Sequence, residues 1–265
     1  MNRIEQTFRR LKEKGEKALI PFITAGDPDL DTTRALVMEM ARRGADIIEL
    51  GIPFSDPLAD GPTIQAASTR AIAGGTHLAE VLELVGRLRR DTDIPLVLMG
   101  YYNPILQYGL KAAARDAARQ GVDGFIIPDL PLEEAGPWRK AAGQAGVATI
   151  FLAAPTSGTE RIQKAGEFTR GFLYYVSVTG ITGARTELPS DLAAALKAVR
   201  SLVNCPLAVG FGIAAPEQVA WLAPYVDGVV VGSAIVQRVA KLKGKKLIQE
   251  IGNFIAALKA PLRAG

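Results

Sequence analysis

The sequence contains a single cysteine, Cys205, and a single histidine, His77, among its 265 residues. One cysteine excludes an internal disulfide and a cysteine-rich metal site. His77 lies in GGTHLAEVLELV, where a loop enters an amphipathic helical pattern, so a surface or helix-capping position is expected. Because no Ser-His or Cys-His pair is expected, acid–base chemistry must come from carboxylates, tyrosine or lysine.

Long apolar runs and a strong net charge are also missing. No run approaches the roughly 18 residues that span a membrane. The first segment, MNRIEQTFRRLKEKGEKALI, lacks the apolar core and cleavage site of a secretory signal, so a cytoplasmic protein is expected. The net charge of +4 is mild. It does not indicate nucleic-acid binding, which needs a clustered basic face, although it is compatible with a small anionic substrate.

Eight short apolar runs alternate with longer helical patterns. Such runs, rich in Ile, Val and Leu, are typical of parallel strands buried on both faces. The alternation predicts an α/β fold, a (β/α)8 TIM barrel formed by a single domain over residues 1–265, with an open doubly wound sheet as the alternative. The runs are 18–24, 45–50, 94–99, 124–128, 147–153, 171–177, 206–212 and 228–232.

Two further helices are expected beyond the barrel pattern. The amphipathic segment before the first run predicts an extra N-terminal helix, which would close the barrel floor. After the second run, a helical pattern over 62–73 is followed by another that begins after Thr76. The second βα unit is therefore predicted to carry an extra helix.

The stretch ELGIPFSDPLADGP places three carboxylates at the end of the second run and in the residues that follow it. Glu49 shares a strand face with Ile47, and the carboxyl ends of barrel strands form the active face. Burial there would raise the pKa of Glu49 toward neutrality, whereas a solvated or lysine-paired Glu is the alternative. Three prolines stiffen the loop, which suits positioning of Asp56 or Asp60. Asp60 is equally compatible with the N-cap of a helix beginning at Pro62.

Glycine sites follow the last two runs. Gly212 comes before one helical pattern, and Gly232 and Ser233 come directly before another. Exposed N–H groups at a helix start attract anions, and barrel enzymes frequently bind phosphate after strands seven and eight. A third glycine-containing loop, SVTGITGART, follows the sixth run. The residues therefore indicate a small phosphorylated substrate and carboxylate chemistry, with no obvious metal or cofactor.

Several motifs together resemble one family across nearly the whole chain. PFITAGDP, ELGIPFSDPLADGPTIQ, LMGYYNP, IIPDLP, GITGAR, GFGI and GSAIV occur in the order found in the tryptophan synthase α-subunit family. The resemblance implies a lyase of tryptophan biosynthesis that cleaves indole-3-glycerol phosphate to indole and glyceraldehyde 3-phosphate. It also implies an α2β2 heterotetramer, in which indole passes to a β subunit that holds pyridoxal phosphate, while this chain needs no cofactor or metal.

The resemblance also implies roles for particular residues. Glu49 would be the general acid–base, Asp60 would hold the indole N–H, and Tyr174 rather than the adjacent Tyr175 would face the site. The phosphate would bind Gly183, Gly212, Gly232 and Ser233. The indole pocket would contain Phe22, Ile64, Leu98, Ile126, Leu152 and Phe211, for which plain core packing is the alternative. Asp129 and Thr182 would support the carboxylates, and Asp56, Tyr101, Tyr102 and Asn103 would face the partner.

Three other functions remain open from the sequence. A free-standing lyase of the same chemistry would release indole without a partner. A non-catalytic barrel that activates a partner is disfavoured because Glu49 and Asp60 are both present. Another phosphosugar barrel, such as an epimerase or isomerase, is disfavoured in its metal-dependent forms, which need several histidines.

Overall fold

The computed structural model describes residues 2–176, 191–210 and 212–263. The predicted Thr182, Gly183 and Phe211 lie outside these ranges. Within them, the strands are β1 (Ala18–Thr24), β2 (Ile48–Gly51), β3 (Leu96–Met99), β4 (Gly124–Ile126), β5 (Ala148–Ile150), β6 (Leu152–Ala153), β7 (Leu173–Val176), β8 (Leu207–Gly210) and β9 (Gly228–Val231).

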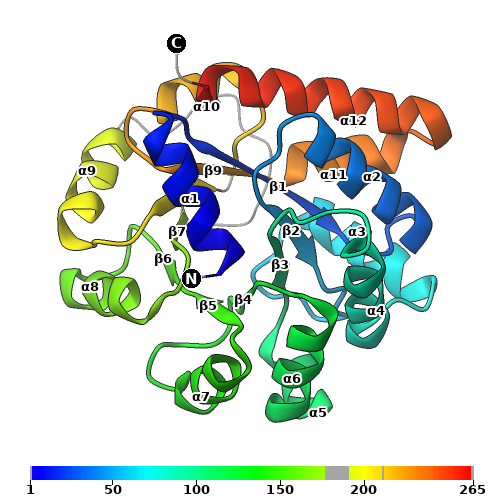
Figure 1. Ribbon diagram of the computed structural model, residues 1–265, viewed down its shortest axis with the longest axis horizontal. Helices are drawn as coiled ribbons and strands as arrows, with labels where there is room; N and C mark the ends of the chain where they lie inside the picture. The colour runs from blue at the N-terminus through cyan, green and yellow to red at the C-terminus, as the bar shows by residue number, and fades with distance from the viewer. Residues whose placement is uncertain (1, 177–190, 211, 264–265) are drawn as a thin grey trace.

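All paired strands are parallel, and their order is β5-β4-β3-β2-β1-β9-β8-β7-β6. The two ends of this order, β5 and β6, are one apolar run that is interrupted at Phe151. The Phe151 carbonyl still accepts a hydrogen bond from the Tyr174 amide at 3.0 Å. The sheet therefore forms a nearly closed barrel (Figure 1), which confirms the predicted TIM barrel.

Helices surround the barrel (Figure 1). They are α1 (Arg3–Glu13), α2 (Leu30–Arg42), α3 (Pro62–Ala73), α4 (Leu78–Leu88), α5 (Tyr102–Tyr108), α6 (Leu110–Gln120), α7 (Gly136–Ala145), α8 (Thr159–Phe168), α9 (Leu192–Leu202), α10 (Pro216–Leu222), α11 (Ser233–Lys241) and α12 (Gly244–Lys259), with a 3-10 turn η1 (Ala260–Leu262). Both α3 and α4 lie between β2 and β3, as predicted. Exposed His77 precedes α4, and its backbone amide donates a hydrogen bond to the Glu80 carboxylate at 2.9 Å. In the described part of the chain, no helix combines the length and apolar character needed to cross a membrane.

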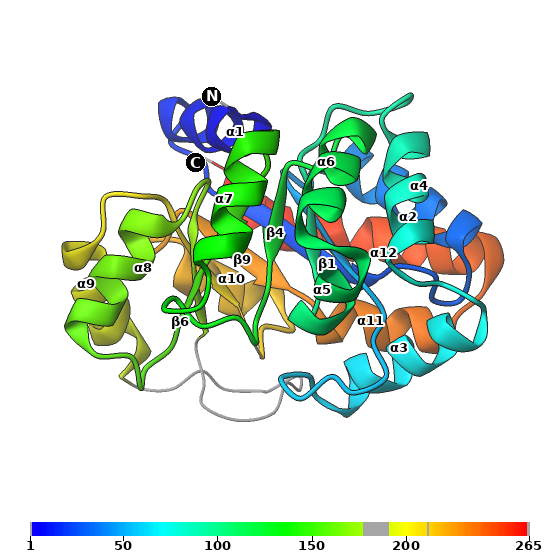
Figure 2. The ribbon, with the colours of Figure 1, turned by 90° about the horizontal axis from the view of Figure 1, so that it is seen from below.

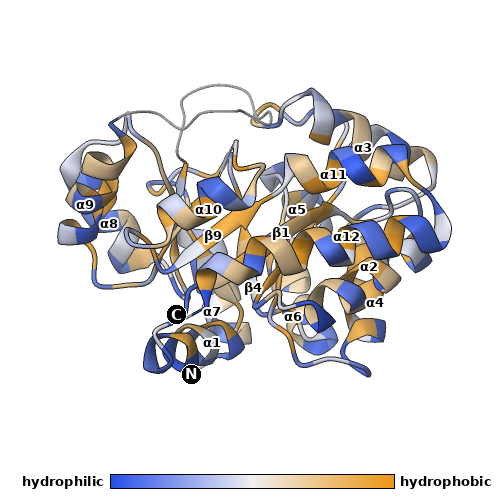
Figure 3. Ribbon diagram, turned by 90° about the horizontal axis from the view of Figure 1, so that it is seen from above, coloured by the Kyte–Doolittle hydropathy of each residue, from blue (hydrophilic) through white to orange (hydrophobic). Residues whose placement is uncertain are grey.

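Helix α1 closes the amino end of the barrel, as expected. Its buried residues Ile4, Phe8 and Leu11 belong to the same apolar cluster as Ile20 of β1 and Phe172, which precedes β7. Figure 2 shows α1 at one end of the barrel and α3 toward the other. In Figure 3 the strands are largely apolar, whereas the outer helices carry both polar and apolar residues. Helix α1 does not cover the opposite end of the barrel, where the strands have their carboxyl ends and where a site can form.

Side chains on each strand alternate between two apolar layers. On β2, Ile48 and Leu50 pack against the helices, whereas Ile47, just before the strand, joins the barrel interior. Glu49 lies between Ile48 and Leu50, so its side chain points inward. On β7, Tyr174 belongs to the interior layer and Tyr175 to the helix-facing layer. The strand period alone thus divides the adjacent tyrosines between two environments.

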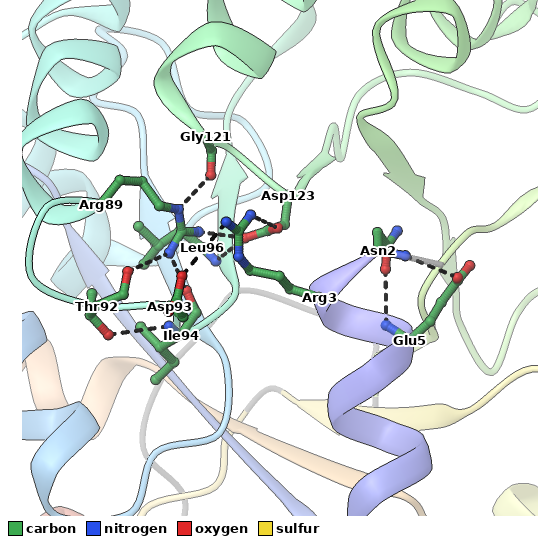
Figure 4. Close-up of polar contacts among 10 residues, drawn as sticks. All are labelled: Asn2, Arg3, Glu5, Arg89, Thr92, Asp93, Ile94, Leu96, Gly121 and Asp123. Carbon is green, nitrogen blue, oxygen red and sulfur yellow. Dashed lines mark hydrogen bonds and ion pairs between the residues drawn. The ribbon is translucent and has the colours of Figure 1, made fainter.

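Aspartates that precede the strands hold the amino end of the barrel. Asp123, just before β4, accepts hydrogen bonds from Arg89 at 2.5 Å, Arg3 at 3.2 Å and the Leu96 amide at 2.8 Å (Figure 4). Two other aspartates near strand starts repeat the arrangement: Asp46 accepts from the Leu19 amide and Asp227 from the Leu207 amide, each at 2.9 Å. These contacts tie neighbouring strands together at the end away from the site.

Candidate active site

A cavity opens at the carboxyl ends of the strands. It combines an apolar wall with two carboxyl groups and a glycine-containing rim, the usual make-up of a small-molecule site. The lining residues are Phe22, Glu49, Asp60, Ile64, Met99, Tyr174, Gly212, Ile213, Val230, Gly232 and Ser233. They come from β1, β2, β3, β7 and β9, from α3 and α11, and from loops after β2 and β8.

Glu49 is the buried acid of the cavity, with a side chain that is 1% exposed. It lies beside Phe22 in the β1–β2 register, and both side chains line the cavity. Among the described residues, its Oε2 atom has no hydrogen-bond partner. Burial, helped by the nearby Asp60 charge, raises the pKa of Glu49 to about 8. Glu49 is therefore mostly a neutral acid at pH 7 and can donate a proton.

Asp60 is the more acidic member of the pair. Burial raises its pKa to about 6, and a hydrogen bond from Tyr101 opposes this rise. The capping alternative does not hold, because the N-cap of α3 is Gly61 and not Asp60. Between about pH 6 and pH 8, Asp60 is therefore ionised while Glu49 keeps its proton. The two carboxyl groups can then perform different chemistry in one cavity.

Tyr174 completes the inner wall, and the structure turns it rather than Tyr175 toward the cavity. Burial, with the nearby charges of Glu49 and Asp60, raises its pKa well above the ordinary value, so the phenol stays neutral. Its hydroxyl lies directly against Gly210 of β8, where an added Cβ would be 2.3 Å from the hydroxyl oxygen. Glycine at 210 therefore makes room for the tyrosine.

The glycine rim lies across the cavity. Gly212 has a φ of +84°, which favours glycine, and follows β8. Gly232 is the N-cap of α11, which begins at Ser233. At Gly232, an added Cβ would lie 3.4 Å from the Phe22 ring, so the missing side chain keeps the backbone open to the cavity. The first amides of a helix lack partners within the helix and can bind an oxyanion.

The residues predicted for the indole pocket separate into three groups. Phe22 and Ile64 line the cavity. Ile126 and Leu152 face the barrel interior without lining the cavity. For Leu98 the prediction is wrong, because Leu98 pairs in register with Leu50, and both point toward the helices.

Sequence reasoning missed Met99, Ile213 and Val230, which line the cavity. Met99 could have been identified from the pairing of β3 with β2. Glu49 lies opposite Val97, so the residue two positions later on β3 shares its inward face.

The residues predicted to face a partner also divide. Asp56 and Asn103 are exposed and Tyr102 is half-buried. Tyr101 does not belong with them: it is only 5% exposed, and its hydroxyl contacts Asp60. Asp129 is exposed, and its carboxylate accepts a hydrogen bond from the Tyr102 amide at 2.8 Å. That bond lies at the start of α5, next to Tyr101 rather than beside Glu49.

Metal-ligating residue types do not gather in the described ranges, where no group of three or more His, Cys, Asp or Glu side chains could hold a metal ion. The described residues can supply proton transfer through Glu49, charge stabilisation through Asp60 and anion binding through the backbone amides of the glycine rim.

Comparisons with known proteins find relatives along almost the whole chain. The family model described as tryptophan synthase alpha chain matches residues 8–260. The tryptophan synthase alpha chains of Geobacter sp. (strain M21) and Citrifermentans bemidjiense are 52% and 53% identical, covering 100% of this chain and 99% of each relative. A crystal structure of tryptophan synthase subunit alpha from Legionella pneumophila has a TM-score of 0.88 at 38% identity, covering 99% of this chain and 98% of that one. A chain of Mycobacterium tuberculosis tryptophan synthase has a TM-score of 0.91 at 36% identity, covering 100% and 99%. The chain therefore belongs to the tryptophan synthase alpha chain family.

Proposed function

We propose that this cavity cleaves indole-3-glycerol phosphate to indole and glyceraldehyde 3-phosphate, the lyase reaction of the family. The observation that supports the residue roles most strongly is the pair of carboxyl groups in one apolar cavity. Glu49 has a pKa near 8 and Asp60 a pKa near 6, so one is a proton donor and the other an anion at neutral pH. Retro-aldol cleavage at an aromatic ring needs both.

The reaction begins at the indole ring. Glu49 donates its proton to C3 of the ring, and the ring nitrogen takes up the positive charge. The N–H of that cation donates a hydrogen bond to the Asp60 carboxylate, whose charge stabilises it. The apolar wall, with Phe22 and Ile64, holds the ring and limits competition from water.

Bond cleavage follows. The bond between C3 and the side chain breaks, and its electron pair returns to the ring, which regenerates neutral indole. The hydroxyl on the departing carbon loses its proton to the Glu49 carboxylate, and its oxygen becomes the aldehyde carbonyl. Glu49 thus ends in its starting protonation state.

The phosphate end of the substrate fits the opposite rim. Gly212, Gly232 and Ser233 present backbone at the start of α11 and in the loop after β8. Gly183, which follows β7 in the sequence, is proposed to bind the phosphate as well, and Thr182 to support the carboxylates. Binding the phosphate there leaves the glycerol carbons between the rim and the two carboxyl groups.

Indole passes from this chain to a tryptophan synthase β subunit in the proposed assembly, an α2β2 heterotetramer in the cytoplasm. Pyridoxal phosphate belongs to that partner. The surface suited to it includes Asp56, Tyr102 and Asn103, near Leu58, which is 92% exposed in the same loop as Asp56. A free-standing lyase is the second candidate, although no observation in the described structure favours it.

Indole release by the purified full-length chain tests the catalytic roles. Glu49→Gln should reduce turnover by about a hundredfold or more, because it removes the proton donor. Asp60→Asn should cause a large loss while the fold is retained. Glu134→Gln, which changes an exposed carboxylate in the loop between β4 and α7, is the matched control and should leave turnover unchanged. Near wild-type turnover by Glu49→Gln would overturn the assignment.

Adding a β subunit separates the two candidate functions. Strong activation of indole release, together with co-elution of the two chains, supports the heterotetramer. Unchanged turnover with no co-elution supports the free-standing lyase.

A further inference from the structure

The Tyr101 hydroxyl lies between two consecutive residues of the loop that carries Asp60. It accepts a hydrogen bond from the Ala59 amide at 3.0 Å and donates one to the Asp60 carboxylate. Tyr101 itself follows β3 and is 5% exposed. One buried hydroxyl therefore holds both the backbone and the side chain of the β2 loop.

Tyr101 is in turn fixed from two sides. Its ring packs on Phe54 of the β2 loop, with ring centroids 5.3 Å apart. The neighbouring Tyr102 amide donates to the Asp129 carboxylate at 2.8 Å, which fixes the backbone where α5 begins. Tyr101 thus connects the loops after β2, β3 and β4 at the rim of the cavity.

We propose that Tyr101 is a positioning residue for the lyase reaction, holding the Asp60 carboxylate in place as the anion that receives the indole N–H. This inference rests on the proposed role of Asp60. Tyr101 acts through Asp60 and is not itself a proton donor to the substrate.

The hydrogen bond has a consequence for titration. Within the described ranges, the charged and titratable groups around Asp60 are Glu49 on β2, Tyr174 on β7 and Tyr101, and Asp129 lies near Tyr101 from the β4 side. Burial raises the pKa of Asp60, and the Tyr101 hydrogen bond opposes that rise because it favours the anion. Without the hydroxyl, Asp60 should bind its proton at a higher pH.

Tyr101→Phe tests the proposal, with Tyr108→Phe as the matched control. The Tyr108 hydroxyl donates to the Asp116 carboxylate at 3.1 Å, away from the cavity, so the control removes the same type of bond. For Tyr101→Phe, the acid limb of the kcat–pH profile for indole release should move up by about half a pH unit or more. Turnover near pH 6 should then fall about twofold or more relative to turnover near pH 8. Tyr108→Phe should keep the wild-type profile.

A parallel loss of turnover at every pH would show a merely structural role and overturn the proposal. A second readout is independent of activity: the 13C shift of the Asp60 carboxyl carbon, assigned by its loss in Asp60→Asn, should titrate at a higher pH in Tyr101→Phe. An unchanged titration would also overturn it. If Asp60→Asn retained full turnover, the proposed function of Asp60 would fail instead, whatever the carboxyl titration showed.

Discussion

Single side chains in this barrel take their chemistry from burial. Glu49 on β2 and Asp60 in the loop after it are ordinary carboxylic acids, yet burial and neighbours separate their pKa values to about 8 and about 6. The difference arises because Glu49 lies deep in the apolar interior, whereas Asp60 receives a hydrogen bond from Tyr101. The position of Glu49 at the end of a strand suggested its raised pKa, but nothing local in the sequence indicated the contact between Tyr101 and Asp60.

Keeping Glu49 buried should cost stability, in a way that depends on pH. Its folded pKa is about 8 against an ordinary 4.5, so the folded state holds a proton that the unfolded chain releases. Stability from this group is therefore present below about pH 4.5 and is lost as pH rises toward 8, about 3 kcal/mol by pH 7.

Glu49→Gln, which stays neutral, should accordingly be more stable than the wild type, with an advantage that grows from about pH 5 to pH 8. Urea unfolding across this range measures the difference. An advantage that is constant with pH would contradict the raised pKa.

Strands and their flanking loops divide the barrel into a structural end and a chemical end. At the amino end, Asp46, Asp123 and Asp227 hold strand starts through backbone and ion-pair contacts. At the carboxyl end, by contrast, Glu49 carries a buried oxygen without a partner among the described residues. The three aspartates at strand starts are therefore satisfied by partners, whereas this oxygen of Glu49 is available to a substrate.

Asp123→Ala tests the structural end. It leaves the mostly buried Arg89 guanidinium without its carboxylate partner, so unfolding free energy should fall by about 3 kcal/mol or more. Glu133→Ala removes the exposed pair with Arg161 and should lower the unfolding free energy far less, because solvent screens that pair. Turnover per folded molecule should be unchanged in both. Equal destabilisation by the two substitutions would contradict the distinction between buried and exposed pairs.

Two exposed apolar side chains lie on different helices of the outer ring. Apolar Leu106 on α5 is 48% exposed, on the same short helix as Asn103, while Trp221 on α10 is 40% exposed. In Figure 1, α5 and α10 lie on opposite sides of the barrel. Trp221 on α10 can therefore serve as a control position for substitutions in the proposed partner surface on α5.

Leu106→Asp should weaken activation by the β subunit about tenfold or more, because it places a charge in the proposed contact. Trp221→Asp should leave activation unchanged. Indole release by the free chain should be the same in both variants and in the wild type. Titration of each variant with the β subunit gives the comparison, and equal effects of the two substitutions would exclude α5 from the interface.

Local patterns predicted the barrel, with a doubly wound sheet as the alternative, and placed Glu49, Asp60 and the glycine sites at or after strand ends. The separate roles of the two carboxylates came from the family resemblance. Periodicity and turn chemistry act over a few residues and can be read from one chain. Only the tertiary structure decided that Leu98 packs outward, that Met99 lines the cavity and that Tyr101 turns inward to Asp60. Those outcomes depend on strand register and on contacts between separate loops, and both exist only after the barrel has nearly closed.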